Sequence, residues 1–152
     1  MIDRYSREVL KNIWSDYNKY SLWLKIEIAS AQAMEKYKII PKGVSKKVIK
    51  KAKINPKRIL EIEKKVKHDV IAFLTSITEK VGKEARYLHK GMTSSDVLDT
   101  CLNLQLKQSG EILVKDLDLL LSSIKKQANK HKFTICIFLT PNILRYLLVS
   151  RF

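Results

Sequence analysis

Glycine and proline are scarce in this sequence, and extended alternating patterns are missing. The 152 residues include 4 glycines and 3 prolines. Apolar and polar residues never alternate over enough positions to predict a sheet. Because few breakers interrupt the chain, long segments are free to form helices. The hydrophobic content of 45% is typical of a globular chain with a core. The sequence therefore predicts an all-α protein.

Cysteine and apolar segments are also too sparse for several classes of protein. Cys101 and Cys136 lack metal-ligand spacing, and Cys101 falls within an apolar helical pattern, which predicts a reduced core residue. The N-terminal residues contain no apolar signal region. Residues 135–149 are apolar but include Pro141 and Arg145, and a membrane span needs ~20 clean apolar residues. We therefore expect a cytoplasmic protein without a membrane partner.

Positive charge dominates. The chain has 30 Lys and Arg residues against 15 Asp and Glu, a formal net charge of +15. Such a balance indicates a nucleic-acid partner as one possibility. However, lysine prevails over arginine, and the densest stretch, residues 36–67, has few aromatic side chains to stack on bases. We expect no specific nucleic acid, but a solvated lysine-rich surface that also attracts an anionic small substrate.

Capping residues and apolar periodicity predict the helices. Predicted starts lie at Ser6, at Ser15-Asp16, at Ser45 and at Asn55-Pro56. The segment 70–74 is apolar and expected to be buried, and Gly82 closes its helix. The last helix runs from about Ser95 to about Lys130, and a helix of that length needs partner helices. It predicts a bundle and self-association.

Three polar clusters interrupt the helical pattern. Arg4-Tyr5-Ser6 offers a guanidinium fork and a hydroxyl for a phosphate or carboxylate, although a frayed terminus is the alternative. Lys67-His68-Asp69 lies at a helix junction, where the histidine could act as acid, base or anion donor. An ordinary junction histidine with a capping aspartate explains the same residues.

The third cluster is the loop His89-Lys90-Gly91-Met92-Thr93-Ser94-Ser95-Asp96, which leads directly into the long helix. Ser94, Ser95 and Asp96 are suitable N-cap and first-turn residues. A helix N-terminus offers unpaired N–H groups and partial positive charge, and the loop adds hydroxyls and an imidazole. We interpret it as an anion seat. A simple cap, with His89 closing the preceding turn, is the alternative.

Cofactor motifs are missing from the sequence. It contains no metal box, no glycine-rich nucleotide loop and no Cys-His nucleophile pattern. Any enzymatic activity would therefore be acid–base and anion-holding chemistry, with no metal and no cofactor.

Together, these segments resemble the adenylosuccinate lyases of the fumarase/aspartase superfamily over residues 1–134. The matching segments are Ile2-Asp3-Arg4-Tyr5-Ser6, Ile13-Trp14-Ser15, Trp23-Leu24-Lys25-Ile26-Glu27, Lys67-His68-Asp69-Val70-Ile71-Ala72-Phe73 and His89 to Thr100. The resemblance implies an N-terminal helical domain over 1–94 and the first long helix of a central bundle over 95–134. It also implies a homotetramer with sites shared between subunits.

The implied reaction is a β-elimination in purine biosynthesis. It releases fumarate from adenylosuccinate to leave AMP, and it cleaves succinyl-aminoimidazole-carboxamide ribotide. The resemblance assigns Arg4 and Tyr5 to the nucleotide and Thr93 and Ser94 to a succinyl carboxylate, with His89 close by. Lys67, His68 and Asp69 would contact substrate, and His68 would assist catalysis.

The chain departs from the family pattern after Thr134. The family continues with a Gly-Arg-Thr/Ser-His-Gly segment that carries the general-acid histidine, whereas this chain continues with Ile135-Cys136-Ile137. The later loop with the catalytic serine base is also missing. We interpret residues 135–152 as an atypical apolar tail, out of frame after about residue 137, and expect the truncated chain alone to be inactive. A helical fragment that assembles with a separately encoded remainder is the alternative.

Overall fold

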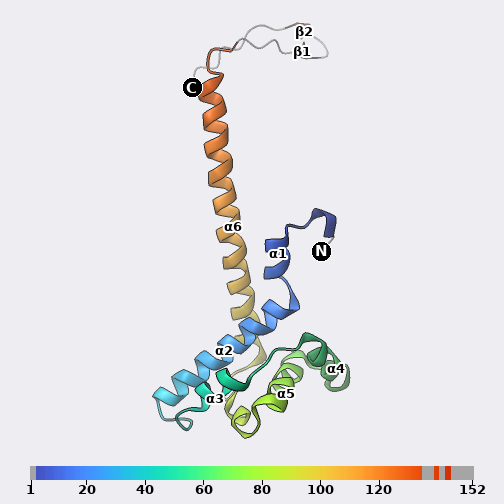
Figure 1. Cartoon of the computed structure of the whole chain (residues 1–152), viewed down its shortest axis with the longest axis vertical. Helices are drawn as coiled ribbons and strands as arrows, with labels where there is room; N and C mark the ends of the chain where they lie inside the picture. The colour runs from blue at the N-terminus through green and yellow to red at the C-terminus, as the bar shows by residue number, and fades with distance from the viewer. Residues whose placement is uncertain (1–2, 135–138, 141–142, 145–152) are drawn as a thin grey trace. The chain divides into compact units, whose positions relative to one another are not determined.

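The chain is almost entirely helical. A computed structural model describes residues 3–134, 139–140 and 143–144 (Figure 1). The elements in chain order are η1 (Asp3–Tyr5), α1 (Glu8–Ile13), α2 (Asp16–Lys36), α3 (Val44–Lys51), α4 (Pro56–Val66), α5 (Asp69–Val81), η2 (Lys83–Tyr87), α6 (Ser94–Lys130), β1 (Leu139–Thr140) and β2 (Ile143–Leu144). The two strands pair antiparallel over two residues each. The all-α prediction is confirmed. The expected out-of-frame tail lies largely outside the described residues.

Most helix starts follow the predicted capping chemistry. Ser15 accepts a hydrogen bond from the Asn18 N–H at 3.2 Å, and Asn55 accepts one from the Arg58 N–H at the same distance. Pro56 occupies the first turn of α4, where its missing N–H costs nothing. The sequence correctly identified these starts because side chain and helix lie next to each other in the chain.

Two predicted starts were misplaced. The first helix begins at Glu8 rather than Ser6, because the backbone of Arg7 is extended and its carbonyl accepts the first helical bonds. The basic helix begins at Val44 rather than Ser45, directly after Gly43 with φ of 91°. Gly43 has no side chain to cap α3, and the Glu35 carboxylate from α2 accepts the Ser45 N–H at 2.6 Å instead.

The chain divides into two compact units, residues 1–109 and 110–152. An aromatic cluster of Tyr20, Trp23 and Phe73 lies at the core of the first unit. Trp23 meets Tyr20 and Phe73 edge-on, with ring centroids 5.3 Å and 5.5 Å away. Tyr20 and Phe73 stack at 6.1 Å. Since two rings come from α2 and one from α5, the cluster joins these two helices.

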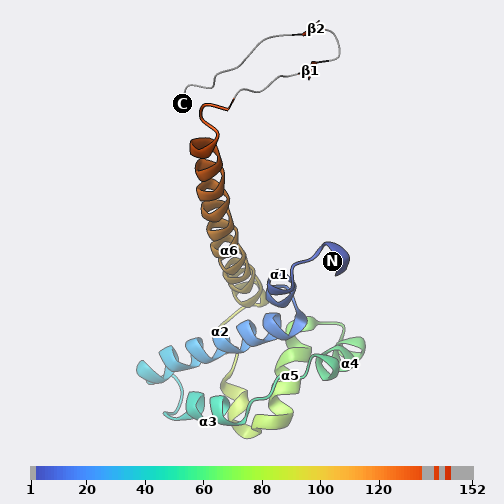
Figure 2. The same ribbon diagram turned by 45° about the horizontal axis from the view of Figure 1, so that its top comes forward.

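Helix α5 buries one side. Val70, Ala72 and Phe73 are buried as predicted, but Ile71 is half exposed and Leu74 is only partly buried. On the neighbouring α4, Arg58 bonds Glu79 of α5 at 2.7 Å, and the two helices lie side by side in Figures 1 and 2. Exposed ion pairs of this kind add at most about 1 kcal/mol to the free energy of unfolding, so this pair contributes little to stability.

Polar contacts join the α1–α2 turn to the first part of α6. Three hydrogen bonds span the first unit: Gln105 Nε2 to the Ile13 carbonyl at 2.8 Å, Asn18 Nδ2 to Gln108 Oε1 at 3.3 Å, and Trp14 Nε1 to Ser109 Oγ at 3.1 Å. Nearby, the free thiol of Cys101 is buried, as predicted, and this burial raises its pKa. Cys101 is therefore a core residue and a poor nucleophile.

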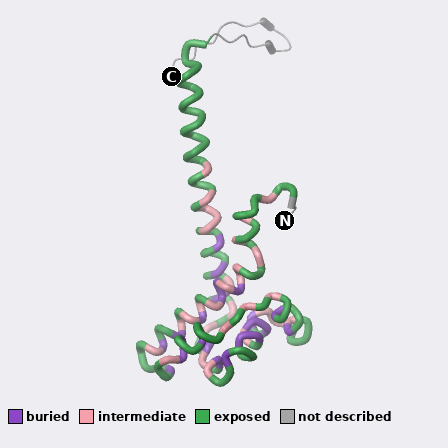
Figure 3. The backbone as a smooth tube through the Cα atoms, viewed as in Figure 1, coloured by how far each residue is buried: buried purple, intermediate pink, exposed green. Residues whose placement is uncertain are grey.

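The second unit exposes apolar side chains. Leu113, Leu117, Leu120 and Ile124 repeat at intervals of three and four residues, and all are more than half exposed. In Figure 3 the exposed colour covers nearly all of α6 beyond residue 110. Among the described residues, no helix is long and apolar enough to cross a membrane.

We predict that Phe73→Ala lowers the free energy of unfolding by about 3–5 kcal/mol, because it removes a ring from the aromatic cluster. Ile71→Ala on the same helix is the matched control and should change it by far less, since Ile71 is 49% exposed. Urea unfolding followed by circular dichroism measures both. Equal losses would mean that the cluster does not hold α2 against α5.

A second prediction concerns acid stability. Hydrogen bonds from the Ser45 and Gly43 backbones lower the pKa of Glu35. Its contribution to stability should therefore be complete above the ordinary glutamate pKa of about 4.3 and fade as pH falls through the lowered folded value. The difference in unfolding free energy between the native chain and Glu35→Gln, measured by urea unfolding from about pH 7 to about pH 3, should shrink with acid. A constant difference would contradict the assignment.

Candidate functional site

The His89–Ser94 loop is the best-organised of the three predicted clusters. It follows η2 and ends where α6 begins. His89 has φ of 58° and Gly91 has φ of 72°, so the backbone turns twice through the left-handed region within three residues. A non-glycine residue holds this conformation only where its surroundings enforce it. At His89 the enforcing partner is Glu27 of α2.

Glu27 is a carboxylate inside the core, 1% exposed. Its Oε2 accepts the His89 backbone N–H at 2.7 Å, and its Oε1 lies 2.7 Å from His89 Nδ1. Both oxygens are therefore used by one residue that lies 62 positions away. A buried carboxylate needs such partners, because an unpaired buried charge costs several kcal/mol.

The start of α6 is capped differently from the prediction. Thr93, rather than Ser94 or Ser95, is the flanking residue, since the helix begins at Ser94. Asp96 reaches back so that its Oδ2 accepts both the Thr93 N–H at 2.7 Å and the Thr93 hydroxyl at 3.2 Å. This is the reciprocal half of a capping box. The Thr93 donors are thus already engaged by an internal carboxylate.

The capping arrangement changes how the loop would hold an external anion. Ser94 and Ser95 remain as first-turn residues with N–H groups at the helix N-terminus, where partial positive charge favours an anion. Thr93 would join them only if Asp96 released it. The anion seat stays a prediction, with Asp96 as the group that competes with the ligand.

The Lys67–Asp69 cluster forms the junction of α4 and α5, as predicted. Lys67 ends α4 with φ of 55°, and His68 is the N-cap of α5. His68 Nδ1 accepts the Ile71 N–H at 3.4 Å and lies 3.5 Å from Asp69 Oδ1. Both contacts are long, and both lie at the first turn of α5.

Arg4 and Tyr5 belong to η1, and both are exposed. The Arg4 guanidinium lies over the Tyr5 ring at 4.7 Å from its centroid, a cation–π contact. The Lys67–Asp69 cluster and the His89–Ser94 loop are each held by hydrogen bonds of their own.

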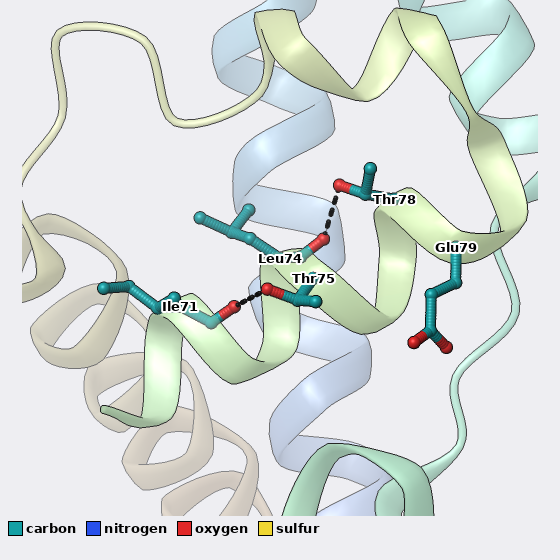
Figure 4. Close-up of a pocket in the computed structure, with 5 residues that line it drawn as sticks. All are labelled: Ile71, Leu74, Thr75, Thr78 and Glu79. Atoms are coloured by element: carbon teal, nitrogen blue, oxygen red, sulfur yellow. Dashed lines mark hydrogen bonds between the residues drawn. The ribbon is translucent and has the colours of Figure 1, made fainter. Parts of the chain in front are cut away.

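An open hollow on α5 is a poor candidate for an anion site. It has a volume of about 330 Å³ and is lined by Ile71, Leu74, Thr75, Thr78 and Glu79 (Figure 4). The two threonine hydroxyls donate to carbonyls of their own helix at 2.7 Å and 2.8 Å. Its one carboxylate, Glu79, pairs with Arg58. No cation faces an incoming anion from these five residues.

Comparison with known proteins decides the family. A family model described as "Lyase" matches residues 3–140. The chain belongs to this lyase family. No group of three or more metal-ligating side chains gathers among the described residues of this lyase chain.

Within this family, two curated relatives that the chain resembles are both adenylosuccinate lyases. Adenylosuccinate lyase of Synechocystis sp. is 44% identical over 137 residues, which is 90% of this chain and 32% of that protein. Adenylosuccinate lyase of Bacillus subtilis is 43% identical over 135 residues, 89% of this chain and 31% of that protein. The lyase chain thus spans about a third of the length of these relatives.

Solved structures share the fold. Fumarate lyase from Mesorhizobium sp. BNC1 matches 93% of this chain and 35% of its own, with a TM-score of 0.79 and 19% identity. A β-carboxy-cis,cis-muconate cycloisomerase from Acinetobacter calcoaceticus sp. ADP1 has a TM-score of 0.78 and 24% identity over 93% of this chain. At these identities the likeness supports the helical fold alone.

Sequence reasoning missed two features of the site. Glu27 was recognised only as part of a family segment, and nothing local reveals that a carboxylate on α2 meets a loop 62 residues later. The reach of Asp96 back to Thr93 could have been found, because a threonine followed three residues later by an acid is the pattern of a capping box. The predicted cap was placed at Ser94 or Ser95 instead of Thr93.

Proposed function

We propose that this chain is the part of an adenylosuccinate lyase that holds the substrate. The observation that carries the proposal is the 43–44% identity to adenylosuccinate lyases over about nine-tenths of the chain. The reaction is the release of fumarate from adenylosuccinate to leave AMP, and the parallel cleavage of succinyl-aminoimidazole-carboxamide ribotide. It belongs to cytoplasmic purine biosynthesis.

In this β-elimination a base removes a proton from Cβ of the succinyl group. The electron pair forms the carbon–carbon double bond of fumarate, the C–N bond breaks, and its electrons pass to the purine nitrogen, which an acid protonates. Charge develops on the adjacent succinyl carboxylate, so donors fixed around it lower the barrier. The N-terminal turn of α6 and the His89 imidazole are donors of this kind.

The roles of the other clusters follow from their chemistry. Arg4 and Tyr5 are exposed and offer charge and a hydroxyl to the nucleotide portion. Lys67 adds a cation, and the His68 imidazole assists near the reacting end. The principal general acid and base come from the remaining two thirds of the enzyme, so this chain alone does not complete the reaction.

A partner is proposed from the apolar face of α6. Leu113, Leu117, Leu120 and Ile124 share this face and are exposed in the single chain. Burying one leucine contributes about 1.5–3 kcal/mol, so a packed face of this size stabilises an assembly strongly. We infer that further copies of the subunit cover it in a homotetramer.

The function is tested by joining residues 3–134 to the remaining two thirds of the Bacillus subtilis enzyme, in place of its own matching segment. We expect the chimera to release fumarate from adenylosuccinate and the 152-residue chain alone to release none above a buffer blank. In the chimera, His89→Asn should lower kcat/KM by about 100-fold or more, because it removes a donor fixed at the developing charge.

Two results would contradict the proposal. One is fumarate release by the chain alone. The other is a chimera of correct size and helix content that does not cleave adenylosuccinate.

The assembly is tested in the same chimera with Leu117→Glu and Leu120→Glu, which place charge on the apolar face. We expect analytical ultracentrifugation to show loss of the tetramer. Ser122→Glu is the matched control, since it adds the same charge about half a helical turn away from this face, and it should leave the mass unchanged. Equal masses for all three variants would sink the tetramer assignment for this face.

A further inference from the structure

Glu27 is the one acidic side chain that the described core buries completely, and the proposed chemistry has not yet used it. It is 1% exposed, and its helix supplies Tyr20 and Trp23 to the aromatic cluster. A carboxylate in such surroundings costs several kcal/mol of desolvation unless each oxygen is paired. A glutamine or an apolar residue would fill the same space without that cost, so the charge itself needs an explanation.

The partner of Glu27 is a residue of the candidate site. The His89 N–H binds Oε2 at 2.7 Å, and His89 Nδ1 lies 2.7 Å from Oε1. Because backbone and ring are held by the same carboxylate, neither the loop nor the imidazole can rotate without breaking a short hydrogen bond. The left-handed φ of 58° at His89 is the conformation that makes both bonds possible at once.

The geometry also constrains where the ring proton lies. An ionised carboxylate only accepts hydrogen bonds, so its contact with Nδ1 requires a proton on Nδ1. That leaves Nε2 as the other ring nitrogen. No hydrogen bond to Nε2 is found in the described part of the chain, and no side-chain nitrogen there is both buried and unpaired. The His89 side chain is 21% exposed, so Nε2 is the ring nitrogen left for a ligand.

We propose that Glu27 is the positioning residue for His89: its carboxylate keeps a proton on Nδ1 and holds the ring so that Nε2, carrying the second proton of an imidazolium, donates to the substrate anion. The meeting of Nε2 with substrate rests on the proposed lyase function. The proton on Nδ1 and the fixed ring do not. The simpler role, a latch that only holds the loop closed, needs the backbone bond but makes no demand on the ring.

The ring is tested first in the complete chain labelled with ¹⁵N-histidine. The chain has 3 histidines, and single His→Gln variants assign their signals. Two-bond proton–nitrogen correlations report which nitrogen carries the proton. We expect a protonated Nδ1 at His89 in the native chain. A native His89 with its proton on Nε2 alone would overturn the proposal, and this measurement needs no variant at position 27.

Glu27→Gln then moves the proton. The glutamine has one acceptor oxygen for the His89 N–H, and its amide nitrogen donates to Nδ1, so we expect the neutral ring to shift its proton to Nε2. Glu35→Gln is the matched control, because Glu35 lies on the same helix and also accepts a backbone N–H. It should leave the His89 signals unchanged. Unchanged signals in Glu27→Gln would overturn the proposal.

Kinetics in the chimera separate positioning from mere structure. In Glu27→Gln the ring is uncharged and less firmly held, so it binds the succinyl carboxylate less well both before and during the reaction. The variant should therefore raise KM for adenylosuccinate about tenfold and also lower kcat. A latch that only keeps the protein folded would lower the active fraction, which reduces the apparent kcat at unchanged KM. The latter pattern would count against positioning, and Glu35→Gln should leave KM unaltered.

The two proposals fail separately. If the native chimera lacks lyase activity while the His89 signals respond to Glu27→Gln, the lyase function fails and the fixed ring stands. If the native chimera is active while neither the signals nor KM respond, the positioning role fails and the lyase function stands.

Discussion

The packing of Tyr20 and Trp23 against Phe73 is the contact on which the rest of the first unit depends. It fixes α2 beside α5, and it thereby sets the positions of the side chains that these two helices carry. Glu27 follows Trp23 by one helical turn, so the aromatic cluster also sets the depth at which this carboxylate meets the loop before α6. At the other end, α5 begins with His68 as its cap. The packing of the core therefore also sets the positions of Glu27 and His68 in the candidate site.

Left-handed residues recur where the candidate site departs from helix. Lys67 and His89 both have positive φ although neither is glycine. Such backbone costs of order 1–3 kcal/mol and persists only when neighbouring contacts overdetermine it. For His89 the Glu27 carboxylate supplies those contacts. For Lys67 the N–H bond to the Glu63 carbonyl closes α4 and lets His68 start the next helix at once.

Local chemistry made much of the fold predictable. The caps at Ser15 and Asn55, the proline in the first turn of α4 and the closing Gly82 all act within a few residues, so the sequence displayed them directly. Ile71 was misjudged because an apolar run does not reveal which of its members face the core.

Long-range pairing was the harder part. The three polar clusters were visible as interruptions of the helical pattern, but their partners were not. Glu27 meets His89 across 62 positions, and Gln105 meets the Ile13 carbonyl across 92. No periodicity encodes such meetings, because they depend on how whole helices pack. The resemblance to a family supplied functional expectations for these residues, whereas only the three-dimensional arrangement exposed the buried carboxylate behind the loop.

The bonds between the α1–α2 turn and α6 have a consequence for the order of folding. The groups of this turn form hydrogen bonds with residues that are synthesised some ninety positions later. The pairs are Trp14 with Ser109, Asn18 with Gln108, and the Ile13 carbonyl with Gln105. Contacts so distant along the chain form slowly, since the intervening segment must first be closed into a loop. The aromatic core can assemble earlier, from α2 and α5 alone. The turn at Ile13 is therefore synthesised early and fixed late, only after the first turns of α6 have been made.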